Sequence, residues 1–371
     1  MNKSYEPLSK HIQPIDTRNT DMVTERLLGI NIDKYFMPSV ANVIGTDLSR
    51  YKLISKGLFA CNTMHVGRDE RLPVALYEED EPAIVSPAYT MFKITDENCM
   101  LPEYLMMWFK RTEFDRICWL KTDGSVRGGI SWDDIGRLEL PVPSLDKQKS
   151  VVKAYKTITD RITLKRAIND NLEATVMALY KDKFLCENPL PDGWCIGKFT
   201  DIADVVMGQS PSGEDCNNDN NGEPLLNGPT EFSDYYPTAI QWTTAGNKRC
   251  QPGDILFCVR GSTTGRMNWA DREYIIGRGL AAIRHKKDIS LNWFIKSTLD
   301  EHLPTLLAAA TGSTFPNIGK DLLNGFTVVI PATAALLEFG AKGSAIRIQI
   351  TCNAEEIAKL TQLTSILMSD L

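Results

Sequence analysis

The longest regular pattern in the sequence is a run of about forty residues, 144–184, that contains neither glycine nor proline. Apolar side chains recur in it at alternating spacings of four and three, the heptad spacing of a helix with one apolar seam. The seam positions are Val151, Tyr155, Ile158, Ile162, Lys165, Asn169, Leu172, Val176 and Leu179. The pattern predicts one long helix whose seam is interrupted by polar residues near its middle.

A shift of 188 residues repeats this pattern in the last part of the chain. The shifted seam positions are Phe339, Gly343, Ile346, Ile350, Asn353, Ile357, Leu360, Thr364 and Leu367. A glycine inside a helix costs about 1 kcal/mol relative to alanine, so Gly340 and Gly343 count against helical structure in the first turns of this second segment in the free subunit.

The same shift aligns the segments that precede the two helices, without a gap. "TDGSVRGGISWDDIGRLELPVP" at 122–143 falls on "ATGSTFPNIGKDLLNGFTVVIP" at 310–331. Each runs from a Gly-Ser pair through a short predicted helix into an apolar, strand-like run that ends at proline. Ser131 and Asp134 have the spacing of a helix capping box. The chain therefore contains an internal repeat.

A helix with a single apolar stripe must bury that stripe, and the nearest partner for each helix is its own repeat. At 1.5 Å per residue each helix is about 60 Å long. We therefore predict an intramolecular, antiparallel coiled coil, in which Lys165, Asn169 and Asn353 set the register. The alternative is two unrelated surface helices on separate domains.

The rest of the chain reads as strand-rich, and its 371 residues exceed the usual size of one compact domain. The predicted fold class is α+β: two similar strand-rich domains separated by the two helices, in a pseudo-twofold repeat. The predicted segments are domain 1 at 1–142, helix 1 at 143–186, domain 2 at 187–331 and helix 2 at 332–371.

Charge is distributed unevenly along the chain. The net charge is −6, which by itself argues against a free-standing nucleic-acid binder. Residues 247–287, however, hold nine Lys or Arg against three Asp or Glu, a local charge of 9 − 3 = +6. This stretch is the candidate for contact with a polyanion.

Other classes are excluded by simpler observations. Apolar runs fall well short of the ~20 residues of a membrane span, and the first twenty residues lack the apolar core of a signal peptide. The nine cysteines form no C-x-x-C pair and the four histidines are scattered, which predicts no metal site and a cytoplasmic protein with reduced thiols.

The sequence also lacks a recognisable catalytic motif. Ser313 is not in a G-x-S-x-G context, "GSTTGR" at 261–266 is not a phosphate-binding loop, and "GRG" at 277–279 is too short for a dinucleotide fingerprint. Two similar modules on a rigid spacer suit a bipartite target, such as two half-sites on DNA with a helical turn of ~34 Å. A scaffold that does not bind DNA, and an enzyme that uses the Ser313 loop, are the competing hypotheses.

Several segments carry a resemblance to a known family. They are "LLGINIDKYFMPSVANVIGTDLSRYKLISKGLFAC" at 27–61, "VVMGQSPSGED" at 205–215, "PGDILFCVRGSTTGR" at 252–266, "IIGRGLAAIR" at 275–284 and "TGSTFPNIGKDLLNGFTVVIP" at 311–331. Together they resemble the specificity (S) subunit of type I restriction–modification enzymes, over essentially the whole chain. The first module departs from the pattern, because it ends in "DGSVRGGISWDD" rather than the fuller "GSTFPNI" form.

The resemblance implies a non-catalytic subunit. The strand-rich domains would be target recognition domains, each reading one half of a bipartite, asymmetric site on double-stranded DNA. The helices would space them and dock two methyltransferase (M) subunits. S-adenosylmethionine for adenine methylation would belong to the M subunits, and ATP and Mg to restriction (R) subunits in the full complex. This chain would hold no cofactor.

Candidate DNA contacts are polar and cationic residues in loops. In the second domain they are Gln209, Ser210, Ser212, Asn227, Arg260, Ser262, Thr263, Arg266, Arg278, Arg284, Ser313 and Thr314. In the first they are Asn62, Thr63, His65, Arg68, Arg71 and Arg127. For each, a surface ion pair or a turn is the competing interpretation.

Candidate docking residues for the M subunits lie on the exposed flanks of the predicted helices. They are Lys149, Lys153, Arg166, Glu355, Glu356 and Lys359. A solvated helix face is the alternative for these positions.

Overall fold

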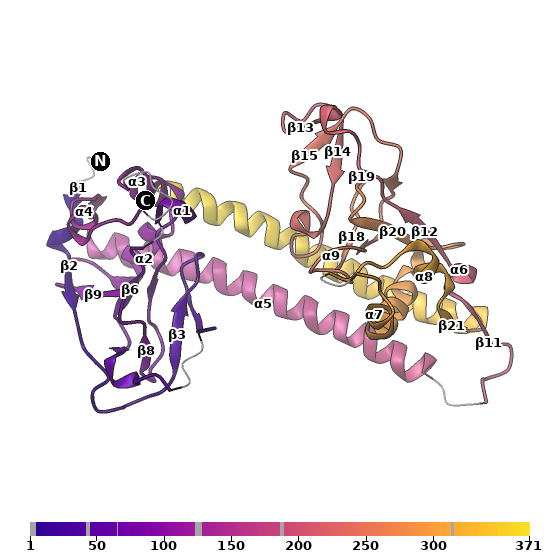
Figure 1. The fold of residues 1–371 in the computed structure, drawn as a ribbon, viewed down its shortest axis with the longest axis horizontal. Helices are drawn as coiled ribbons and strands as arrows, with labels where there is room; N and C mark the ends of the chain where they lie inside the picture. The colour runs from indigo at the N-terminus through magenta and orange to yellow at the C-terminus, as the bar shows by residue number, and fades with distance from the viewer. Residues whose placement is uncertain (1–4, 42–44, 65, 123–127, 186–188, 313–314) are drawn as a thin grey trace. The chain divides into compact units, whose positions relative to one another are not determined.

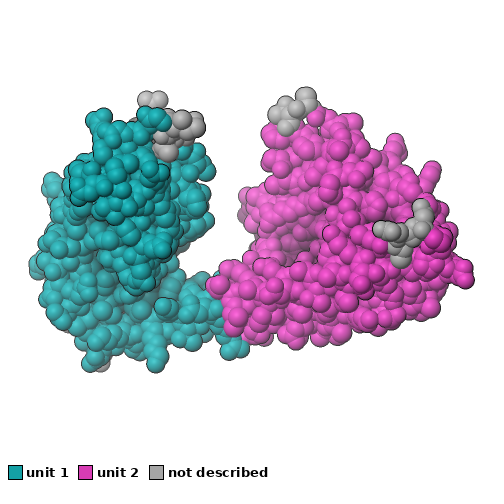
Figure 2. Space-filling view, turned by 90° about the horizontal axis from the view of Figure 1, so that it is seen from below, with its two compact units in different colours: residues 1–161, 360–371 teal, residues 162–359 magenta. Residues whose placement is uncertain are grey.

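The computed structural model describes residues 5–41, 45–64, 66–122, 128–185, 189–312 and 315–371 (Figure 1). The chain forms two compact units, residues 1–161 with 360–371, and residues 162–359, which are coloured separately in Figure 2. Both long helices contribute to both units. The predicted domain boundaries at 142, 186 and 331 therefore stay a prediction.

Two four-stranded sheets and a two-stranded ribbon make up the strands described in the first unit. One sheet has the order β2 (Ile12–Ile15), β9 (Thr90–Ile94), β6 (Phe59–Cys61) and β7 (Val74–Leu76). The other has the order β4 (Phe36–Pro38), β3 (Leu27–Ile30), β8 (Ala83–Val85) and β5 (Lys52–Ile54). The ribbon joins β1 (Tyr5–Pro7) to β10 (Glu139–Pro141).

The second unit builds corresponding sheets in the same order, with one additional edge strand, β13. One has the order β12 (Ala203–Met207), β20 (Leu280–His285), β17 (Ile255–Cys258) and β18 (Met267–Trp269). The other has the order β13 (Cys216–Asn217), β15 (Gln241–Thr243), β14 (Glu223–Leu226), β19 (Tyr274–Ile276) and β16 (Arg249–Cys250). The ribbon joins β11 (Cys195–Lys198) to β21 (Thr327–Ile330).

Short helices connect these strands. In the first unit they are η1 (Leu8–Lys10), η2 (Leu48–Arg50), α1 (Val66–Asp69), α2 (Pro102–Phe109), α3 (Thr112–Leu120) and α4 (Trp132–Gly136). In the second they are α6 (Phe199–Ile202), η3 (Gly213–Asp215), η4 (Pro229–Glu231), η5 (Ile289–Leu291), α7 (Asn292–Ala308) and α8 (Lys320–Gly325). The predicted cap is present, since the Ser131 hydroxyl accepts from the Asp134 N–H at 3.1 Å.

The internal repeat is visible in single bonds as well as in sheet order. The pair β3 and β8 is parallel in the first unit, as β14 and β19 are in the second. The Ile130 N–H donates to the Thr63 carbonyl at 3.1 Å, and the Ile318 N–H donates to the Val259 carbonyl at 2.9 Å. Ile130 and Ile318 are 188 residues apart, so the repeated segment docks on the loop after the central strand in both copies.

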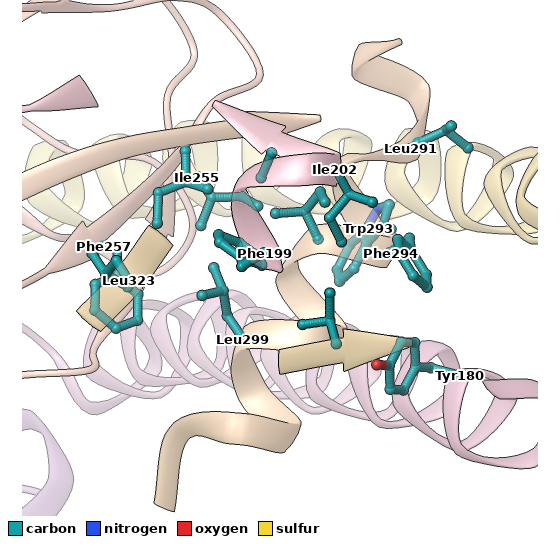
Figure 3. Packing of buried hydrophobic residues seen from close by; sticks show 14 of the residues in the cluster. Tyr180, Phe199, Ile202, Ile255, Phe257, Leu291, Trp293, Phe294, Leu299 and Leu323 are labelled. Atoms are coloured by element: carbon teal, nitrogen blue, oxygen red, sulfur yellow. The ribbon is translucent and has the colours of Figure 1, made fainter. Parts of the chain in front are cut away.

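Each unit has its own apolar core. In the second unit, side chains from α5 (Leu145–Phe184), α6, β17, α7 and α8 point toward one another (Figure 3). In the first unit, the stacked rings of Phe59 and Phe92, 4.9 Å apart, pack among the residues of α2 and α3. Val151 of α5 and Leu371, which follows the second long helix, belong to this core.

The two long helices, α5 and α9 (Thr333–Ser369), pack side by side and antiparallel, as predicted. In the second unit the rings of Tyr180 and Phe339 meet at 6.3 Å, and Lys183 pairs with Glu338. Closer to the start of α5, Lys165 contacts Asn353, further along α9. The partner residue moves backward as α5 advances, which defines the antiparallel direction.

The polar residues of the predicted seam contact one another. The Lys165 Nζ donates to the Asn353 Oδ1 at 2.9 Å, and the Asn353 Nδ2 donates to the Asn169 Oδ1 at 2.7 Å. Lys165 also pairs with Glu356 at 2.9 Å. Lys165 and Asn353 are 188 residues apart, so equivalent positions of the repeat contact each other here. A shift in register would separate these groups.

Gly340 and Gly343 do not interrupt the second long helix. Helix α9 runs through both, and both are buried against the second domain. A Cβ on Gly340 would lie 2.5 Å from the Leu291 side chain, and one on Gly343 would lie 3.1 Å from Trp293. Close packing against η5 and α7 offsets the low helix propensity of glycine.

We predict that Asn353→Leu lowers the stability of the helix pair by about 1–3 kcal/mol, because the half-buried Asn169 Oδ1 loses its donor and the Lys165 Nζ loses one of its two acceptors. The double variant Asn169→Leu, Asn353→Leu should regain much of that loss, since the two amides are removed together and Lys165 keeps Glu356 as its partner. Urea unfolding measures both, with the exposed Asn171→Leu as control. A single variant as stable as the control would contradict the prediction.

Candidate nucleic-acid interface

Four loops of the second domain converge on one open depression of about 660 Å³. Its lining residues are Ser210, Asn227, Arg260, Arg278 and Gly279. They follow β12, β14 and β17, or lie between β19 and β20. Four of the five are contacts predicted from sequence, which the fold brings together from positions up to 68 residues apart.

Backbone hydrogen bonds fix these loops to one another. The Val259 N–H donates to the Gly279 carbonyl at 2.9 Å, which joins the loop that carries Arg260 to the loop that carries Arg278. The Arg278 N–H donates to the Ser210 Oγ at 3.2 Å. The depression is therefore held by the sheet, and its arginines project from rigid positions.

Glycines make this close approach possible. A Cβ on Gly279 would lie 2.3 Å from the Asn227 carbonyl oxygen, and one on Gly208 would lie 2.1 Å from the Gly277 carbonyl oxygen. Both clashing atoms belong to the backbone, which cannot move aside as the end of a flexible side chain could. The "GRG" at 277–279, too short for a dinucleotide fingerprint, thus serves loop packing.

The arginines of the positive stretch, residues 247–287, fall into two groups according to their contacts. Arg249 is paired with Glu223 at 2.5 Å and Arg284 with Asp254 at 2.5 Å. Arg266 and Arg272 lie over the rings of Phe232 and Tyr274, at 6.0 and 5.1 Å.

Arg260 and Arg278 differ from these four. Both are exposed, and within the described part of the chain neither guanidinium forms an ion pair. These are the two arginines that line the depression.

Asn227 is held by a residue that sequence reasoning missed. Its Nδ2 donates to the Gln241 Oε1 at 2.8 Å, from the end of β14 to β15. Gln241 lies fourteen residues along the chain in a segment without a motif, so its contribution follows from the pairing of the two strands.

The remaining predicted contacts of this domain lie on the same loops. Gln209 and Ser212 are exposed after β12, and Ser262 and Thr263 are exposed after β17. Their contact with DNA stays a prediction. Ser313 and Thr314 lie outside the described residues.

Arg284 has a different setting. It is half-buried on β20, and its partner Asp254 is fully buried. Burial raises the pKa of Asp254, while hydrogen bonds from Gln251 and Arg284 act in the opposite direction. The guanidinium stabilises this buried carboxylate, so contact of Arg284 with DNA competes with a structural role.

The repeated segment contacts the loop that carries Arg260. Arg260 and Asn317 form a backbone bridge, and the Thr264 hydroxyl donates to the Pro316 carbonyl at 2.9 Å. Gly312 has a φ of +111°, and a Cβ there would lie 2.2 Å from the Phe315 carbonyl oxygen. The described residues 315–318 of the repeated segment thus dock on the loop after β17.

The first domain has a depression of about 650 Å³ built from related loops but with different chemistry. Residues after β3 and β6 line it, and these strands correspond to β14 and β17. Acidic and basic side chains both line it: Asp33, Lys34, Asp69, Glu70, Arg71, Lys110, Asp115 and Arg116. Buried Lys34 pairs with Asp115 at 2.7 Å, and burial lowers the pKa of Lys34.

Two of the predicted contacts in this domain are engaged by carboxylates. Arg68 binds Asp69 at 2.6 Å, and Arg71 binds Asp33 at 2.9 Å. Asn62 and Thr63 are half-buried in the loop after β6, where Thr63 receives the repeated segment. Their contact with DNA stays a prediction, and His65 and Arg127 lie outside the described residues.

Some of the predicted docking residues form ion pairs within the chain, and the others are exposed. Arg166 is paired with Asp234 at 2.8 Å, and Glu356 is paired with Lys165. Lys149 and Lys153 on α5, and Glu355 and Lys359 on α9, are exposed. In the ranges that the structure describes, no ion pair involves these four.

Two further properties bear on the class of site. Among the described residues, no group of three or more His, Cys, Asp or Glu side chains is arranged to hold a metal ion. A search of the same residues finds no helix with the length and apolarity needed to cross a membrane.

Comparison with known proteins gives consistent results. Residues 191–335 match the family profile described as "Type I restriction modification DNA specificity domain". A candidate type I restriction enzyme specificity subunit (MjaX) of Methanocaldococcus jannaschii is 24% identical over 326 residues, covering 83% of this chain and 75% of the relative. The MjaIX specificity subunit of the same organism is 20% identical over 301 residues, covering 75% and 70%.

The fold has a counterpart among solved structures. A type I restriction–modification S subunit from M. genitalium aligns with a TM-score of 0.53 at 13% identity. The alignment covers 99% of this chain and 95% of that one.

We predict that Gly279→Ala disturbs the depression while the domain stays folded. The added Cβ would overlap the Asn227 carbonyl oxygen, and relief of such overpacking typically costs about 1–3 kcal/mol. Thermal melting should show a lowered midpoint. Gly213→Ala, where a Cβ meets no atom within 4 Å, is the control and should melt like the wild type. Equal melting of the two variants would contradict the close approach.

Proposed function

The chain belongs to the specificity subunits of type I restriction–modification systems, and from that premise we propose that each of its two domains reads one half of a bipartite, asymmetric DNA site. Phosphate contacts would position the domains, and contacts to base edges would specify the sequence. The asymmetry would follow from the two depressions, whose linings are chemically different.

One observation supports this proposal most strongly. In the second domain, loops from four places in the chain bring two arginines without carboxylate partners to the rim of one depression. An exposed, unpaired guanidinium on a rigid loop suits a base edge or a phosphate. A protein-interaction scaffold, the competing function, gives no reason for this convergence, although the net charge of −6 favours it.

The chemistry of modification would belong to partner subunits. We assign S-adenosylmethionine and adenine methylation to the M subunits, and ATP and Mg to R subunits, in a cytoplasmic complex. The family relationship supports a chain that specifies the target and leaves catalysis to its partners. Net negative charge fits this division if the partners supply much of the phosphate contact.

Two M subunits would dock on the exposed flanks of the helix pair. The candidate contacts narrow to Lys149 and Lys153 on α5, with Glu355 and Lys359 on α9, because Arg166 and Glu356 are engaged within the chain. The two docking faces would not be alike. A shift of 188 residues places exposed Leu337 and Ala341 where the first helix has the two lysines.

We predict that exchange of residues 187–330 for the second domain of another specificity subunit changes one half of the methylated sequence and leaves the other half unchanged. The reason is that each depression lies within one domain. Sequencing of methylated adenines in cells that also express an active M subunit measures this. A change in both halves would contradict independent reading.

We also predict that Lys149→Glu with Lys153→Glu weakens binding of one M subunit by at least about tenfold, since reversed charge at an interface is strongly unfavourable. The mass of the purified complex should fall from two M subunits per chain to one. The control is Lys286→Glu with Lys287→Glu, at exposed lysines of the second domain. An unchanged mass would exclude this face as a docking site.

A further inference from the structure

The lining of the second depression matches one kind of base pair better than the others. Arg260, Arg278 and Ser210 offer donors, and no carboxylate lines the depression. In the major groove, guanine presents two acceptors, O6 and N7, and its partner cytosine presents an amino donor. Adenine and thymine each present one acceptor, so a surface rich in donors favours guanine.

Arg278 is placed for such a contact by the backbone around it. It stands between Gly277 and Gly279, and neither neighbour has a side chain that could cover it. Its own N–H is held by the Ser210 Oγ at 3.2 Å, which fixes the start of the side chain. The guanidinium is thus exposed on a rigid loop and keeps both arms of its fork for a ligand.

Asn227 distinguishes a base edge from a phosphate. Its amide is oriented by the bond from Nδ2 to the Gln241 Oε1 at 2.8 Å. Within the described residues, its Oδ1 accepts no hydrogen bond, and a phosphate, which only accepts, could not supply one. An amino group on a base could do so. The cytosine of a G·C pair carries that amino group beside the two acceptors of guanine.

We propose that the second domain selects a G·C pair in its half of the DNA site. Arg278, with Arg260 beside it, donates to guanine O6 and N7, and Asn227 accepts from the cytosine amino group. This inference rests on the proposed function and adds the chemical identity of one recognised base pair. The depression of the first domain differs, because carboxylates line it together with its cations.

The test uses the chain in complex with its M subunits and synthetic duplexes that carry its methylated sequence. Each guanine of the second half-site is replaced in turn by 7-deazaguanine, which pairs normally but lacks the N7 acceptor. At one position the wild-type complex should lose about tenfold in affinity, as expected for a bidentate arginine contact. With Arg278→Gln the same replacement should have almost no further effect, since the two changes remove one interaction.

Two variants make the result specific. Arg278→Lys keeps the charge but lacks the planar fork, so it should reduce the 7-deazaguanine effect while keeping the salt dependence of binding. Arg249→Gln, in the same positive stretch but paired with Glu223, should behave like the wild type. Thermal melting of each complex checks that the variants are folded.

Three results would overturn the inference. The second half-site could contain no G·C pair, no guanine could respond to loss of N7, or Arg278→Gln could weaken all sequences alike with the 7-deazaguanine effect intact. The last pattern would make Arg278 a phosphate contact. Failure of the proposed function is distinguishable, because the wild-type complex would then methylate no defined sequence although its M subunit is active.

Discussion

The structure depends on the need of two long amphipathic helices to bury their apolar seams. Neither helix could expose its stripe to water alone, and the repeat supplies a partner in the same chain. The pairing passes through a polar centre at Lys165, Asn169 and Asn353, where groups 188 residues apart in sequence meet. Polar groups at a seam cost stability but specify register. Because both helices enter the cores of both units, the register also determines which part of each helix a domain packs on.

The candidate recognition surface of the second domain is a consequence of sheet order. Four loops are joined by main-chain hydrogen bonds, and glycines at 208, 277 and 279 allow their backbones to approach. The result is a rigid depression with two arginines that lack carboxylate partners. Other cations of the same positive stretch, such as Arg249 and Arg284, are used to hold the fold. Local charge indicates the region, and ion pairing decides which cations remain for a ligand.

Much of the fold was predictable from sequence, for identifiable reasons. The helices followed from heptad spacing, their pairing from the repeat, and the cap at Ser131 from a four-residue signature. Gly340 and Gly343 counted against a helix because helix propensity depends only on the local sequence. In the folded chain Leu291 and Trp293 pack closely against these two positions and leave little room for side chains there. At the candidate site, the loops containing Ser210, Asn227, Arg260 and Arg278 were identified, but not their convergence. Gln241 was not predicted as part of the site, because strand pairing, and not sequence spacing, brings it to Asn227.

The central claim is that one chain with two different recognition surfaces specifies a split DNA sequence. The most direct measurement is the map of methylated adenines in cells that carry this chain with an active M subunit, compared with cells that carry the M subunit alone. The account predicts one motif, present only with the chain, made of two unlike halves at a constant separation. Absence of any motif, or one continuous motif without a gap, would contradict it.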